Sequence, residues 1–354
     1  MYSLFTLFLG CAGIINYATV QKVAPKGLAE PDLAKACRLG ESLNHVLPAF
    51  SYNPPELAMV IADTTAGLCE EFPAWEAELR KERALKNQPL GPARIAEVKD
   101  AQFTADRAHK RAALRYYSAF QYLESHMGEI DAIEECPFIE PEEEMPFMIG
   151  SISGILAVLH DKQSGGLAEV PVDILPRLAR VMDCVDNETW WYTPQAIQGS
   201  VWVTIPGSGP EGVDPWDTLE GAAQQGSPMG VRIGWAMHNL IAANAGEQER
   251  LGQGILSHSY SISSNTADQD WQLLDEYSYW VTRHQSDLIW TKHSGYRTEV
   301  LGSLPPYESQ IDSDEDEFGE DEFGEDEFGE DEFGENPVEE SSPDTSSESK
   351  EDTK

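Results

Sequence analysis

The fold is indicated most clearly by residues 214–262, which read DPWDTLEGAAQQGSPMGVRIGWAMHNLIAANAGEQERLGQGILSHSYSI. This stretch predicts three helical segments joined by very short turns. Apolar side chains recur at helical spacing in the middle segment and form a stripe on one face: Ile233, Met237, Leu240 and Ile241. The pair Ala245-Gly246 ends that segment, and Glu247 places a negative charge in the first turn of the next one. We therefore expect a helical hairpin here.

Neighbouring helices are expected to pack closely against this hairpin. The middle segment is rich in small residues, namely Gly234, Ala236, Ala242, Ala243 and Ala245. Two helices alone cannot bury their apolar faces, so further hairpins should stack on them, as in tetratricopeptide-type arrays. Helical patterns recur at 28–46, 53–71, 103–127, 145–160, 171–185 and 268–290, and residues 190–194 open another short helix. The charged span 76–99 is expected to be partly helical, and the nearly all-apolar span 145–160 to be a central, buried helix. The sequence thus predicts an all-α, tetratricopeptide-like array or bundle of helical hairpins over residues 28–300.

The charge of the chain is strongly negative and unevenly spread. The 354 residues carry a net charge of −38, and residues 311–354 contain 21 acidic and 2 basic side chains. The motif Glu-Asp-Glu-Phe-Gly occurs four times between Glu315 and Gly334. Low hydrophobicity and self-repulsion predict that residues 301–354 form a disordered acidic tail. Neither the tail nor the rest of the chain has the basic surface that nucleic acid requires, so we expect no nucleic-acid partner.

An apolar run near the start of the chain leads into the sequence Phe8-Leu9-Gly10-Cys11. The run is too short to cross a bilayer, which takes about 20 apolar residues. It is similar to a bacterial lipobox, in which the cysteine becomes lipidated, although Phe8 and Leu9 depart from the usual pattern and no Lys or Arg precedes them. We therefore expect a signal and lipobox segment at 1–11, lipidation at Cys11 and a spacer at 12–27. The alternative is an ordinary apolar segment.

The four remaining cysteines are Cys37, Cys69, Cys136 and Cys184. They permit up to two disulfides in an oxidising compartment, with the pairing left open. Buried free thiols are the equally weighted alternative.

Patterns that carry chemistry are weak in this sequence. Residues 207–212, GSGPEG, match GxGxxG, and a strand over 201–205 could precede them. However, Pro210 lacks the N–H group that a dinucleotide phosphate would need, so a loop between helices is the better interpretation. The eight histidines show no metal-ligand spacing, and no nucleophile motif occurs. We expect no enzyme activity, no metal and no cofactor.

The first candidate contacts for a ligand or partner are basic. Arg107, Lys110, Arg111 and Arg115 follow one another at spacings of three or four residues in the helix predicted at 103–127. Arg111 and Arg115 could attract an anionic ligand or partner. The alternatives are a solvated face paired with acidic residues elsewhere, and a site for the acidic tail.

The other candidate contacts are aromatic residues and one histidine. Tyr116 shares a face with the apolar residues of the same predicted helix, and Trp191 and Trp235 would present an apolar surface if they lined a channel. His238 lies one turn from Trp235 and is expected in a pocket or in the interior. For the tryptophans, the alternative is a role in the core.

Taken in order, these patterns resemble the T-component (TatT) family of lipoproteins associated with TRAP-type transporters. The matching pieces are the lipobox-like segment at Cys11, SYNPPELAMVIADTTAGLCEEF, RAHKRAALRYYSAFQYL, FMIGSISGILAVLHD and the stretch GSGPEG through GEQERL. The resemblance extends from about Cys11 to Ser294 and does not include the acidic tail. It implies degenerate tetratricopeptide-like hairpins, a lipid anchor facing the periplasm, homo-oligomers and association with the substrate-binding protein of a transporter.

The resemblance leads to an expected function. The chain would be a periplasm-facing lipoprotein of the bacterial cell envelope that binds a periplasmic substrate-binding protein of a TRAP-type transporter, a small organic ligand, or both. The alternative is a general surface lipoprotein adaptor whose acidic tail makes the protein contacts and which has no role in transport.

Overall fold

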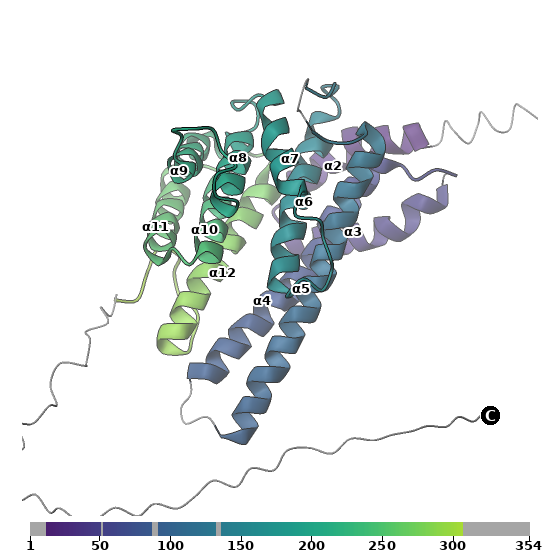
Figure 1. Ribbon diagram of the computed structural model, residues 1–354. Coiled ribbons are helices and arrows are strands. Elements are labelled where there is room, and N and C mark those ends of the chain that lie inside the picture. Colours follow the sequence, from purple (N-terminus) through teal and green to yellow (C-terminus); the bar gives the residue numbers. More distant parts are fainter. Residues whose placement is uncertain (1–11, 51, 87–90, 132–135, 307–354) are drawn as a thin grey trace, which may run out of the picture. The chain divides into compact units, whose positions relative to one another are not determined.

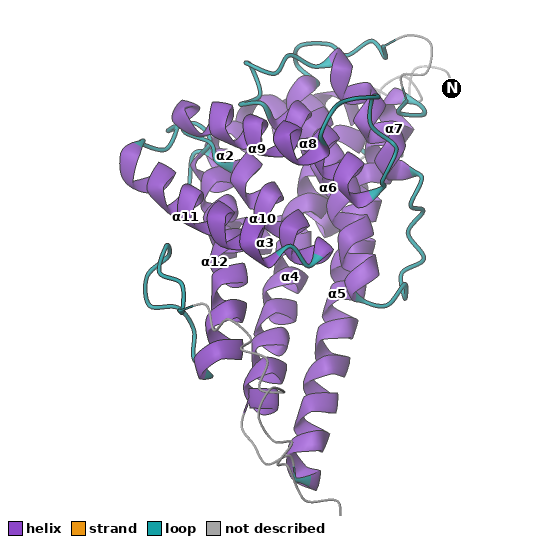
Figure 2. Ribbon diagram, turned by 60° about the vertical axis from the view of Figure 1, so that its left-hand side comes forward, coloured by secondary structure: helices purple, strands orange, loops and turns teal. Residues whose placement is uncertain are grey.

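Every regular element in the computed structural model is a helix over the residues that it describes, 12–50, 52–86, 91–131 and 136–306 (Figures 1 and 2). The expected all-α class is therefore confirmed for these residues, which contain eleven α-helices packed as antiparallel neighbours. Cys11 and the acidic repeats lie outside the described residues. The helices are α2 (Ala24–Leu28), α3 (Leu33–Val46), α4 (Glu56–Lys86), α5 (Pro92–Met127), α6 (Glu144–Gln163), α7 (Ile174–Val181), α8 (Thr193–Thr204), α9 (Pro215–Gly226), α10 (Ile233–Ala245), α11 (Gln248–Ser264) and α12 (Gln272–Ser294).

The three segments predicted at 214–262 are α9, α10 and α11, and local chemistry explains where they begin and end. The side chain of Asp214 accepts a hydrogen bond from the N–H of Trp216 at 2.7 Å, and Pro215 occupies the first turn of α9. Gly246 follows α10 with a φ of +80°, which a glycine adopts without steric cost. The tight turn predicted between α10 and α11 is thus confirmed.

Helices α4 and α5 are the longest and lie antiparallel, side by side (Figures 1 and 2). The prediction that the first of them ends near Glu71 is wrong, because α4 continues through Pro73 to Lys86. A proline inside a helix removes one backbone hydrogen bond and crowds the preceding turn. Here the helix continues because residues beyond Pro73, including Ala77 and Leu79, remain buried in the packed interior.

Small residues let the central helices approach closely, as the sequence predicts. A Cβ atom on Gly154 of α6 would lie 2.9 Å from Cδ2 of Phe120 on α5. A Cβ atom on Gly234 of α10 would lie 2.8 Å from Cα of Ala223 on α9. The prediction of a central, buried helix at 145–160 is also confirmed, since most of α6 is buried.

The four cysteines form two disulfides and are not the buried free thiols of the alternative interpretation. Cys37 and Cys69 join α3 to α4, with Cα atoms 5.2 Å apart. Cys136 and Cys184 join the segment before α6 to the short 3-10 helix that follows α7, with Cα atoms 5.6 Å apart.

Candidate functional site: an apolar cavity and a buried histidine cluster

A cavity of about 140 Å³ lies between α2, α3, α4, α5, α6 and α12. Its deep end is formed by the buried rings of Tyr116 and Tyr277. Its exposed mouth carries the charged residues Glu30, Asp32 and Lys35 and the apolar residues Val23 and Leu39. Between the two ends the wall is mainly aliphatic, with Leu28, Leu33, Ala36, Leu43, Ile61, Leu68, Ile149, Ile152, Leu156, Leu273 and Leu274.

Two threonine hydroxyls in the cavity wall already have hydrogen-bond partners. The hydroxyl of Thr64 donates to the carbonyl of Val60 at 2.7 Å, and that of Thr65 donates to the carbonyl of Ile61 at 2.8 Å. At the mouth, Lys35 Nζ forms an ion pair with Glu30 at 2.5 Å. The interior therefore offers apolar contact, while charged groups lie at the mouth.

The two tyrosines at the deep end connect the cavity to a buried polar cluster. Glu71 of α4 accepts a hydrogen bond from the Tyr116 hydroxyl at 2.8 Å and from the Tyr277 hydroxyl at 3.2 Å. Nε2 of His160, on α6, lies 3.2 Å from the same carboxylate. Only 2% of Glu71 is exposed, so these three donors replace water around its charge.

A second layer of the cluster is centred on Glu78, two helical turns further along α4. The carboxylate oxygens of Glu78 lie 3.1 Å from Nε2 of His109 and 2.7 Å from Nε2 of His284. The Nδ1 atoms of His109 and His160 are 2.9 Å apart and join the two layers. The ring of His284 stacks on Trp75 with centroids 4.9 Å apart. A continuous path of hydrogen bonds therefore extends from the floor of the cavity to Glu78.

The surroundings shift the pKa values of the two tyrosines and of Glu78 away from their usual values. Burial, followed by the charge of Glu71, raises the pKa of Tyr116 and of Tyr277 well above the usual value, so both hydroxyls keep their protons and donate. Burial alone would raise the pKa of Glu78, but the hydrogen bonds and charges of His109 and His284 outweigh it and hold that pKa well below its usual range. Glu78 is therefore an ionised acceptor.

Sequence reasoning missed most of this cluster, although its spacing carries a signal. Its residues form three pairs that are seven positions apart: Glu71 and Glu78 on α4, His109 and Tyr116 on α5, and Tyr277 and His284 on α12. Seven residues make about two helical turns, so each pair lies on one face, about 10.5 Å apart along the axis. A polar pair at this spacing on otherwise small or apolar faces is the pattern that could have indicated a buried network.

The predicted basic contacts Arg111 and Arg115 face α4. Nε of Arg111 donates to Glu70 at 2.6 Å, and Arg115 lies 3.9 Å from the buried carboxylate of Asp63. For these two arginines the structure matches the alternative of a face paired with acidic residues, and neither lines the cavity.

The other predicted contacts lie at three separate places. Tyr116 is at the floor of the cavity. Trp191 is buried against Trp271, with ring centroids 4.7 Å apart. Trp235 lies 5.5 Å from the ring of His238 on α10, where burial lowers the pKa of that histidine. The structure thus places Tyr116 alone of the predicted residues at the cavity.

The remaining sequence motifs do not form a further site in the described ranges. Residues 207–212 form the loop between α8 and α9, and the strand considered at 201–205 is instead the end of α8. Over the same ranges, no group of three or more histidine, cysteine, aspartate or glutamate side chains is arranged to hold a metal ion. No helix among the described residues is long and apolar enough to cross a membrane.

Comparisons with known proteins identified no relative of this chain. No protein-family model matches the chain, and searches of curated proteins and of solved structures gave no match.

Proposed function

We propose that this chain is a binding protein, without enzyme activity, for a small and mainly apolar organic molecule held in the cavity. The observation that carries the proposal is the aliphatic wall between the buried tyrosines and the exposed mouth. Cavities that are concave, mainly apolar and bordered by a few polar groups are typical of ligand sites.

The size and the lining of the cavity define the ligand. An apolar cavity of about 150 Å³ in another protein accommodates one benzene molecule. The volume of about 140 Å³ here therefore suits one aromatic ring or a short alkyl chain. Because the wall is mainly aliphatic and the hydroxyls of Thr64 and Thr65 are already paired, a charged group would lose its hydration inside without compensation. The polar end of the ligand belongs at the mouth, beside Lys35 and Glu30.

Two substitutions on α3 test this proposal. Ala36 lines the cavity, whereas Ala34 is exposed on the same helix and does not line it. Ala36→Leu should fill part of the cavity and weaken binding of hexanol and hexanoate at least tenfold, while Ala34→Leu should leave it unchanged. Isothermal titration calorimetry measures both, and native mass spectrometry of the purified protein shows whether a molecule already occupies the site. Equal affinities for the two variants would contradict the proposal.

The broader role that we propose is that of a T-component-like lipoprotein of a TRAP-type transporter. In this proposal the chain faces the periplasm, is anchored through Cys11 and binds a periplasmic substrate-binding protein, and its hairpins are degenerate tetratricopeptide-like repeats. The pattern resemblance and the two disulfides, which are consistent with an oxidising compartment, support it.

Co-purification tests this broader role. A substrate-binding protein that co-purifies with the anchored chain, and that still does so after removal of the acidic tail, would support the transporter role. Partners that depend on the tail alone would favour the adaptor alternative. Mass spectrometry of the mature N-terminus tests lipidation at Cys11, since an intact Met1 in membrane fractions would contradict the anchor.

A further inference from the structure

We propose that His109 and His160 hold one additional proton between them, which makes the buried cluster a proton-binding site. This inference rests on hydrogen-bond geometry and is independent of the ligand in the cavity. The relevant contacts join Glu71 to His160, His160 to His109, and His109 to Glu78 at 3.2, 2.9 and 3.1 Å.

The argument is a count of protons. Each of these three contacts needs one hydrogen to be a hydrogen bond. Two ionised carboxylates and two neutral imidazoles supply only two hydrogens, one from each imidazole. With two hydrogens, at least one contact would set two lone pairs against each other within a buried site. One further proton satisfies all three contacts, and a fourth hydrogen would bring two N–H or O–H groups into collision.

The extra proton has more than one position along the path. It can reside on either of the two imidazoles, which is then an imidazolium within a chain of hydrogen bonds between two carboxylates. The number of protons is the same in each arrangement, and they interconvert by proton transfer along existing hydrogen bonds. The proton therefore belongs to the cluster rather than to one residue.

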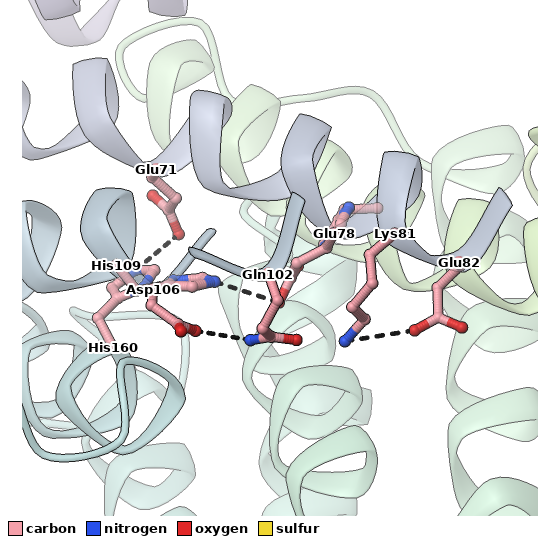
Figure 3. A network of polar contacts seen from close by, with 9 residues as sticks. Glu71, Glu78, Lys81, Glu82, Gln102, Asp106, His109 and His160 are labelled. Atoms are coloured by element: carbon pink, nitrogen blue, oxygen red, sulfur yellow. Dashed lines mark hydrogen bonds and ion pairs between the residues drawn. The ribbon is translucent and has the colours of Figure 1, made fainter. Parts of the chain in front are cut away.

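The groups that face the histidine pair from neighbouring helices can stabilise this proton. Glu71 and Glu78 approach from α4, Tyr116 from α5, and Tyr277 and His284 from α12. Three further charged side chains lie at the edge of the cluster with partners of their own: Lys81 pairs with Glu82 at 3.5 Å, and Asp106 accepts a hydrogen bond from Gln102 at 2.6 Å (Figure 3). The positive charge is thus held between two carboxylates and is not left unpaired.

Water reaches the path at one end. The side chain of Glu78 is 21% exposed, whereas those of His109, His160, His284 and Glu71 are each at most 5% exposed. Exchange of the proton with solvent therefore takes place by way of Glu78.

The proton count fixes the pH dependence of stability. In the unfolded chain, histidines have a pKa of about 6.5. Above that pH the unfolded state therefore lacks the extra proton that the folded state keeps. The folding equilibrium constant should then fall about tenfold per pH unit. Below about pH 6 both histidines of the unfolded chain are protonated, so the unfolded state binds more protons and stability falls with decreasing pH.

Nuclear magnetic resonance on full-length protein labelled with ¹⁵N-histidine tests the proposal directly. At pH 7.5 we expect nitrogen signals of the buried pair that report one shared excess proton, with a strongly deshielded Nδ1 proton. Two neutral imidazoles with separate, localised protons at that pH would overturn the proposal.

A second measurement follows unfolding in urea between pH 7.5 and 9. His109→Gln should abolish the tenfold fall per pH unit, because the amide can donate to both His160 and Glu78 without a titrating proton. His126→Gln is the matched control, since His126 lies on the same helix and has a single carboxylate partner, Glu143, at 2.7 Å. A wild-type protein whose stability is flat over this range, or a control that loses the slope as His109→Gln does, would overturn the proposal. If His109→Gln does not fold, the resonance experiment on the wild type still decides.

Discussion

Glu78 joins two imidazoles from different helices and lies where the buried cluster meets solvent. Its carboxylate accepts from His109 on α5 and from His284 on α12, so one side chain links α4 to both. Glu76 on the same helix provides the contrast, because its ion pair with Arg297 is at the surface and its side chain is 59% exposed. The burial of a carboxylate, rather than the number of its ion pairs, determines how much the free energy of unfolding depends on it.

Glu78→Gln should lower the free energy of unfolding by about 2–3 kcal/mol at pH 7, because the amide group cannot accept from both imidazoles. The pKa of Glu78 lies below its usual value, so this contribution is present above about pH 4.5 and is lost as the pH falls through the folded pKa. Urea unfolding at pH 7 and at lower pH measures the difference. Glu76→Gln should change stability by less than about 1 kcal/mol. Equal effects of the two substitutions would contradict this account.

The sequence revealed residues of the site only where they share an apolar pattern. Tyr116 was predicted because it lies on the apolar face of its helix. His109 lies among buried alanines on that helix, and nothing local shows that its partners come from α4 and α6. Arg111 and Arg115 attracted attention as charges, but their acidic partners, 41 and 52 residues earlier in the chain, could not be identified from spacing. Partners across helices depend on tertiary packing, which one sequence does not specify.

At the scale of the element, α6 packs closely against both α5 and α7. A Cβ atom on Gly154 would meet Phe120 at 2.9 Å and Leu178 at 3.1 Å. On α9, a Cβ atom on Gly221 would have only Gln225 Nε2 near it, at 3.9 Å. Close packing therefore requires a glycine at position 154, whereas no steric contact requires one at position 221.

Gly154→Ala should destabilise the protein by about 1–3 kcal/mol, because the added methyl group overpacks the core. Gly221→Ala should instead stabilise it by up to about 1 kcal/mol, because alanine has the higher helix propensity. Thermal or urea unfolding of both variants measures the two signs. A stabilising Gly154→Ala would show that the packing between α5, α6 and α7 can relax.

Helix positions were largely predictable because apolar periodicity is a local property. The hairpin of α10 and α11 and the central helix α6 were predicted closely. The end predicted near Glu71 is wrong for the opposite reason: α4 continues through Pro73 because its later residues are buried by tertiary packing, which is not a local property.

At the scale of the whole described bundle, the cavity and the histidine cluster share α4, α5, α6 and α12. Helix α3 covers the cavity and is joined to α4 by the disulfide between Cys37 and Cys69. The disulfide between Cys136 and Cys184 instead joins the segment before α6 to the 3-10 helix after α7, and neither of these lines the cavity. The first disulfide is therefore expected to affect both stability and ligand exchange, and the second to affect stability alone.

Replacing Cys37 and Cys69 together by alanine should lower stability by about 2–4 kcal/mol and accelerate dissociation of a bound ligand. Replacing Cys136 and Cys184 together should lower stability by a similar amount and leave the dissociation rate unchanged. Stopped-flow displacement of hexanoate measures the rates. Identical rates in the two double variants would show that α3 does not control exchange.

The disulfide between α3 and α4 has a consequence for which molecules the cavity can bind. Near Cys37, helix α3 cannot move far from α4, so we expect the cavity to widen little when a molecule enters. A cavity of fixed width would select molecules by cross-section: a slender chain could fit with its excess length outside, whereas we expect a bulky compound of equal mass to be excluded.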